Sequence, residues 1–124
     1  MNIVDSSGWL AYFADEPNAN HFLIPLNNAS SLIVPTVTIY EVFKVVLRKS
    51  GENDALQAVV AMRKGTVVDL TATLAIAASK LSLEHNLPMA YSIILTTAKE
   101  FEATIWTQDS NFKNIGGVNY FPKK

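Results

Sequence analysis

Asn2-Ile3-Val4-Asp5-Ser6-Ser7-Gly8-Trp9-Leu10-Ala11-Tyr12-Phe13 switches from a strand pattern to a helix pattern within a few residues. Its first residues favour β structure, and Ser6-Ser7 then provide good helix N-caps. Beyond the serines, the apolar side chains Trp9, Leu10, Tyr12 and Phe13 recur at helical spacing. The sequence therefore predicts a strand that runs straight into a helix, which is a building unit of α/β proteins.

Further along the chain, short apolar runs alternate with longer segments of three-and-four apolar spacing. Breakers such as Pro35 and Gly65 mark their ends. The expected strands are 2–5, 32–34, 66–70, 104–107 and a short edge strand at 118–121. The expected helices are 6–13, a weaker stretch after Pro17, then 36–50, 52–64, 71–85 and 88–98. Strands separated by helices predict a parallel sheet of about four or five strands, flanked by helices on both faces.

Composition is that of a compact protein rather than a disordered chain. The 124 residues suit a single domain spanning 1–124, with 49% hydrophobic and 17% charged residues. No apolar run is long enough to cross a bilayer, and the start of the chain lacks the basic and apolar regions of a signal peptide. We therefore expect a cytoplasmic protein.

The residue inventory limits the chemistry that the chain can support. Cysteine is absent, and His21 and His85 do not have metal-ligand spacing. Any bound metal should therefore be a hard cation held by oxygen. The net charge of −1 gives no overall attraction to nucleic acid, so RNA binding would depend on local patches.

Three acidic residues fall where an α/β sheet places its ligands. Asp5 ends the first strand, Asp109 follows the fourth, and Glu41 lies in the first turns of the helix after the second. Singly, Asp5 could be a helix cap, Glu41 could face water and Asp109 could be a turn residue. Together they favour a cation site, because crowded carboxylates repel one another without a counter-ion. Mg²⁺ is the cation that fits such oxygen ligands.

Four blocks of the sequence resemble a PIN domain when taken in order. They are Val4–Leu10, Thr38–Val42, Leu87–Ala90 and Trp106–Phe112. The likeness runs nearly end to end and is strongest to the VapC-like toxins of toxin–antitoxin pairs. It implies a PIN-like fold and a homodimeric, Mg²⁺- or Mn²⁺-dependent endoribonuclease that a small antitoxin protein neutralises.

The resemblance assigns roles to individual residues. It implies that Asp5 and Asp109 are metal ligands, that Glu41 is a ligand or a base that positions water, and that Ser6 and Thr107 orient these carboxylates. The position of the family's third acid is Tyr91, because the block that usually reads Leu-Pro-x-Ala-Asp reads Leu-Pro-Met-Ala-Tyr here.

Tyr91 should weaken the site. A phenol is neutral at pH 7 and binds magnesium far less well than a carboxylate, and its bulk can fill the metal pocket. The alternative is that the helix register turns Tyr91 away from the site, although the residues on both sides align without a gap. We expect metal affinity and cleavage to be strongly reduced or lost.

Positive charge near the predicted site comes from Lys44, Arg48 and Lys49 on the helix that carries Glu41. Lys44 and Arg48 share a helix face and could bind RNA, or they could form a solvated flank that the helix dipole favours. The aromatic residues Trp9, Tyr12 and Phe13 are expected in the core or in a dimer contact more than in base stacking.

Two other functions compete with an active ribonuclease. One is a catalytically silent dimer that binds an antitoxin or RNA. The other is a phosphate-accepting signalling receiver, which also has a doubly wound sheet of this size. A receiver needs paired acids after its first strand, and Asp5 has no acidic neighbour in sequence.

Overall fold

The computed structural model describes residues 1–124 and contains six α-helices, two 3₁₀ helices and five short strands. The strands are β1 (Asn2–Val4), β2 (Ile33–Pro35), β3 (Thr66–Val68), β4 (Thr104–Thr107) and β5 (Val118–Tyr120). The helices are α1 (Ser6–Phe13), α2 (Ala19–Leu26), α3 (Thr36–Ser50), α4 (Glu52–Met62), α5 (Ala72–His85) and α6 (Met89–Glu100), with 3₁₀ helices η1 (Ala29–Ser31) and η2 (Ser110–Phe112). This order matches the predicted alternation.

All strand pairs are parallel, as predicted. One sheet has the order β1-β4-β5, and β2 pairs with β3 in a second, smaller sheet. The two sheets are neighbours that a single bridge between Asn2 and Leu32 connects. The predicted sheet of about four or five strands is therefore present, with a seam between β1 and β2.

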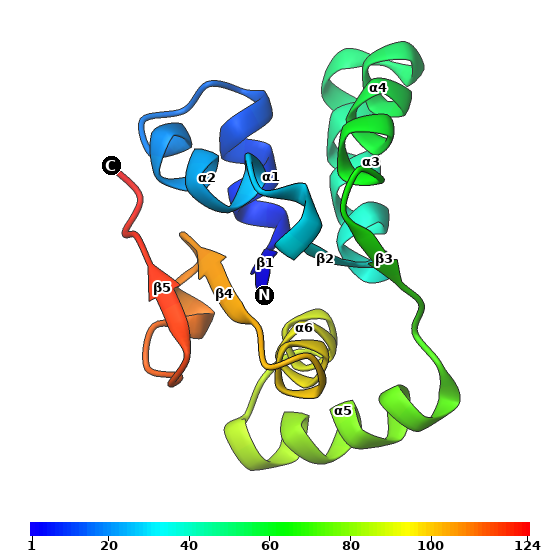
Figure 1. Cartoon of the computed structure of the whole chain (residues 1–124), viewed down its shortest axis with the longest axis vertical. Helices are drawn as coiled ribbons and strands as arrows, with labels where there is room; N and C mark the ends of the chain where they lie inside the picture. The colour runs from blue at the N-terminus through cyan, green and yellow to red at the C-terminus, as the bar shows by residue number, and fades with distance from the viewer.

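Alternating strand residues feed two hydrophobic cores on opposite faces. Val4 and Val34 belong to one core, whereas Ile3 and Ile33, their neighbours in sequence, belong to the other. Helices α1 to α4 supply most of the other residues of the first core, and α6 contributes more residues to the second core than any other helix. Figure 1 shows α1 and α2 on one side of the strands and α6 on the other, with α5 outside α6. These contacts confirm the predicted α/β architecture with helices on both faces.

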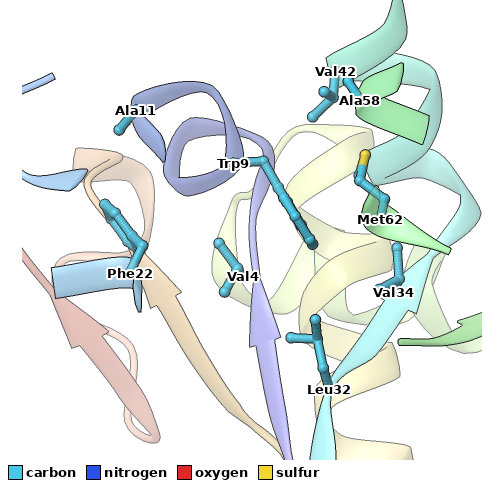
Figure 2. Close-up of a cluster of buried hydrophobic side chains, with 9 residues drawn as sticks. All are labelled: Val4, Trp9, Ala11, Phe22, Leu32, Val34, Val42, Ala58 and Met62. Atoms are coloured by element: carbon cyan, nitrogen blue, oxygen red, sulfur yellow. The ribbon is translucent and has the colours of Figure 1, made fainter. Parts of the chain in front are cut away.

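Trp9 is a core residue, as expected. It is 3% exposed, and Figure 2 shows its ring between Val4 and Met62. Phe13 packs against the edge of the same core and stacks on Trp9, with ring centroids 5.7 Å apart. Tyr12 is 38% exposed at the surface.

Gly8 allows α1 to lie directly against β1 and α2. A Cβ atom at Gly8 would lie 2.6 Å from Cγ1 of Val4 and 2.8 Å from the ring of Phe22, and both side chains are buried. We therefore expect Gly8→Ala to lower the free energy of unfolding by about 1–2 kcal/mol, because overpacking outweighs the helix propensity that alanine gains. Urea denaturation measures this, and Gly116→Ala is the matched control because its added Cβ meets nothing within 4 Å. Equal stability of the Gly8 variant and the parent would contradict this packing.

Candidate active site

Asp5 lies at the junction of β1 and α1 and is 2% exposed. It is the N-cap of α1, since its Oδ1 accepts hydrogen bonds from the Gly8 amide at 3.0 Å and from Ser7 Oγ at 2.7 Å. Its Oδ2 accepts a third hydrogen bond, at 2.6 Å, from Thr107 Oγ1 on β4. The carboxylate therefore caps a helix and also joins the ends of two neighbouring strands.

Burial raises the pKa of Asp5 to about 6, against the lowering effect of the hydrogen bonds from Thr107, Ser7 and Gly8. The negative charge of Asp109 raises this pKa further. Asp109 is thus close enough to Asp5 for its charge to be felt there.

Two hydroxyl groups connect the ends of β1 and β4. Thr107 Oγ1 donates to Asp5 and accepts from the backbone amide of Asp109 at 2.9 Å. Ser7 Oγ donates to Asp5 and accepts from the amide of Gln108 at 3.2 Å. The structure thus places Thr107 beside both aspartates, and it adds Ser7, whose hydroxyl the sequence presented only as a possible helix cap.

Glu41 faces the start of α1 rather than open water. Its side chain is half-buried, and its Oε1 accepts a hydrogen bond from Ser6 Oγ at 3.0 Å. Burial raises the pKa of Glu41, the Ser6 hydrogen bond opposes this rise, and the charge of Asp109 adds to it. Ser6 therefore orients Glu41, whereas Ser7 and Thr107 orient Asp5.

Asp109 follows β4 and caps the 3₁₀ helix η2. Its Oδ1 accepts from the backbone amide of Asn111 at 2.9 Å and from Asn111 Nδ2 at 3.0 Å. Burial alone would raise the pKa of Asp109, but the hydrogen bonds from Tyr91 and Asn111 and the positive charge of Lys123 lower it below its usual value. Asp109 is thus the carboxylate of this group whose ionised form the surroundings favour.

Tyr91 points at Asp109. Its hydroxyl donates to Asp109 Oδ2 at 2.6 Å, and its ring packs edge-to-face on Phe112 with centroids 5.3 Å apart. Burial, together with the hydrogen bond to Asp109 and the charge of that residue, raises the pKa of Tyr91, so the phenol keeps its proton. The alternative in which the register of α6 turns Tyr91 away from the acids is wrong.

The acidic residues in this structure do not fit a divalent cation. No group of three or more His, Cys, Asp or Glu side chains is arranged to hold one ion. Both oxygens of Asp5 and both oxygens of Asp109 accept hydrogen bonds from protein donors, and one of the donors to Asp109 is Tyr91. Asp5, Glu41 and Asp109 thus lie in one region but are not brought together as three ligands of one metal.

A cavity of about 650 Å³ opens beside this region. Ser6, Ser7 and Asp109 line it on the side of the acids, and Lys49 and Lys123 line it elsewhere. No sequence pattern pointed to Lys123, because its position depends on how the last residues of the chain pack.

Asn18 holds those last residues in place. Its Nδ2 donates to the backbone oxygens of Pro122 at 3.0 Å and Phe121 at 3.4 Å. The Phe121 ring stacks on His21 with centroids 4.4 Å apart. These contacts bring the neighbouring Lys123 to the cavity wall and within electrostatic reach of Asp109.

Comparison with known proteins gives a family and a fold. The family model described as PIN domain matches residues 3–118. A toxin–antitoxin complex from Klebsiella pneumoniae contains a chain with a TM-score of 0.83 and 18% identity, over 98% of this chain and 99% of that chain. VapC20 from Mycobacterium tuberculosis, a toxin that cleaves the sarcin–ricin loop, gives a TM-score of 0.79 and 15% identity, over 94% and 95%. DNA-bound VapBC from Salmonella typhimurium gives 0.75 and 14%, over 98% of both chains.

No curated protein matches the sequence. At these low identities, the solved structures establish a shared fold and leave the activity of this chain to its own residues. Every helix is too short or too polar to span a bilayer.

Proposed function

Because this chain belongs to the PIN domain family, we propose that it is the toxin-type member of a toxin–antitoxin pair, with a ribonuclease site that is weakened or inactive. We propose that residues 1–124 form one domain, that the protein is a cytoplasmic homodimer, and that an antitoxin protein and RNA are its partners. The complete form of such a site would use Mg²⁺ or Mn²⁺. Structural neighbours described as toxins and as toxin–antitoxin complexes support this proposal.

The observation that supports the proposed loss of activity is the 2.6 Å hydrogen bond from the Tyr91 hydroxyl to Asp109. A hydroxyl that donates to a carboxylate occupies one of its lone pairs in competition with a cation, and it brings no negative charge of its own. The phenol therefore satisfies Asp109 internally, where an aspartate would have added a further ligand.

The rest of the site supports a nuclease scaffold that is damaged at a single position. Asp5, Glu41 and Asp109 are all present, and the first two accept hydrogen bonds from hydroxyl groups. Such contacts orient carboxylates for ligand binding. The acids are thus held in place although the ligand set is incomplete.

A catalytically silent module that binds an antitoxin or RNA is the alternative. The open cavity of about 650 Å³ beside Asp109 favours this alternative, since a cavity of this size can bind part of a partner without any RNA cleavage. The two functions differ in what restoring the acid would do, because a silent module gains nothing from it.

Induced expression in a bacterial host without an antitoxin distinguishes them. We expect cells making the parent chain to grow normally and cells making Tyr91→Asp to stop growing, because only the latter chain carries the full acid set. Tyr91→Phe is the control, since it removes the same hydroxyl without adding a carboxylate. Normal growth with soluble Tyr91→Asp would sink the masked-toxin proposal.

A further inference from the structure

An exposed row of three residues runs along α3. We call Tyr40, Lys44 and Arg48 the α3 stripe; they are spaced four residues apart, so they share one helix face. Tyr40 is 64% exposed, far more than a tyrosine that fills a core. The Nζ atom of Lys44 lies 5.8 Å from the centroid of its ring, within the range of a cation–π contact.

The positive charges of this row are not neutralised. The sole salt bridge in the structure joins His85 and Glu84, at 4.0 Å, so neither Lys44 nor Arg48 has an acidic partner. The helix dipole explains basic residues in the last turn, where Arg48 lies, but it does not reach Lys44. On a chain with a net charge of −1, two unpaired cations beside an exposed aromatic ring form a distinct local surface.

The α3 stripe also leads to the acidic region. Glu41 follows Tyr40 directly and accepts the hydrogen bond from Ser6. At the end of the same helix, Lys49 lines the cavity that Ser6 and Asp109 border. The α3 stripe therefore runs along the helix face next to the one that carries Glu41 and Lys49.

We infer that the α3 stripe binds single-stranded RNA, with a base stacked on Tyr40 and adjacent phosphates on Lys44 and Arg48. An exposed aromatic ring with cations beside it is the combination by which proteins hold single strands without reading their sequence. Lys44 Nζ lies 5.8 Å from the centroid of the Tyr40 ring, so a base stacked on the other face of that ring would have a cation nearby. This inference rests on the proposed function and identifies the residues that would deliver its substrate.

Fluorescence anisotropy with a labelled single-stranded RNA of mixed sequence tests it, in EDTA so that no cleavage occurs. We expect Tyr40→Ala to weaken binding about tenfold, and Tyr40→Phe, which keeps the ring, to change it less than twofold. Lys44→Gln should also weaken binding and reduce the slope of log affinity against log salt concentration by about one. Lys80→Gln on α5, another exposed lysine, is the matched control and should bind like the parent. Circular dichroism confirms that each variant is folded.

Three results would overturn the inference, and they differ in whether they also contradict the proposed function. RNA binding by the parent with unchanged affinity in Tyr40→Ala and Lys44→Gln would place the RNA elsewhere and leave the proposed function intact. No RNA binding by the parent would overturn the inference and the substrate of the proposed function together. Binding of a polyglutamate peptide through the same residues, without RNA binding, would reassign the α3 stripe to an acidic protein partner.

Discussion

Tyr91→Asp is expected to raise Mg²⁺- or Mn²⁺-dependent RNA cleavage by about 100-fold or more over the parent chain, since the loss of even a supporting contact around a metal costs up to this amount. The substitution removes the hydroxyl that donates to Asp109 Oδ2 and supplies a carboxylate in its place. Carboxylate oxygens are the ligands that these cations prefer, so the variant should bind metal more tightly than the parent.

Two measurements support each other in this experiment. Cleavage of a fluorescently labelled RNA gives the rate, and the shift in melting temperature on adding Mg²⁺ or Mn²⁺ gives metal binding without reference to activity. Without metal, Tyr91→Asp should melt below the parent, because it places a second carboxylate beside Asp109 and breaks an internal hydrogen bond.

The controls separate the two effects of the substitution. Tyr91→Phe should remain inactive, since it frees Asp109 without adding a ligand. Tyr91→Asp combined with Asp109→Asn should lose both the cleavage and the metal-dependent shift. A folded Tyr91→Asp chain that neither cleaves RNA nor responds to metal would show that position 91 does not belong to the site.

The second large effect is on stability, which we expect to fall by about 2–3 kcal/mol as the pH rises from 4 to 7. Asp5 has a pKa of about 6 in the folded chain and an ordinary value of 3.8, a difference of roughly two pH units at about 1.4 kcal/mol per unit. Because the folded state holds the proton more tightly, the stabilisation is complete below the unfolded pKa and is lost as the pH rises through 6. Glu41, whose pKa is also raised, adds to this slope.

Urea denaturation at half-unit pH steps measures the slope. Asp5→Asn should flatten most of it, since an amide of the same shape can still accept from Gly8 and Ser7 and does not ionise in this range. Asp69→Asn changes an exposed aspartate and should leave the slope as in the parent. A parent chain whose stability is constant or rises from pH 4 to 7 would contradict the burial of Asp5 as the dominant cause.

Much of the fold could be predicted from local sequence, because each strand or helix buries apolar side chains that recur along its own segment. Ile3 and Val4 are adjacent in a strand and therefore reach opposite cores, which is why a continuous apolar run predicted a strand covered on both faces. The helix predicted to start at residue 71 has Thr71 as its N-cap, and the Oγ1 atom of Thr71 accepts a hydrogen bond from the Leu74 amide at 3.2 Å. These are short-range effects that depend on few neighbours.

The details of the candidate site depended on contacts between distant segments. The sequence named Ser6 and Thr107 as supporting hydroxyls, but it did not reveal that Ser6 serves Glu41, or that Ser7 bridges to Gln108, 101 positions along the chain. The hydrogen bond from Tyr91 to Asp109 likewise depends on how α6 packs against the end of β4. The roles of these residues in metal binding and catalysis stay predictions.

Because of the seam between β1 and β2, the acidic residues are not all fixed relative to one another by strand pairing. Asp5 and Asp109 follow β1 and β4, two strands of one hydrogen-bonded ladder, so backbone pairing fixes the separation between them. Glu41 is carried by α3, which continues from β2 on the far side of the seam, where one bridge is the only strand pairing and the two cores supply the other contacts. Across that seam, the Ser6 hydroxyl donates the hydrogen bond that holds Glu41 to the start of α1. Small sliding of one half against the other would therefore change the distance from Glu41 to the aspartates while leaving the two aspartates in register.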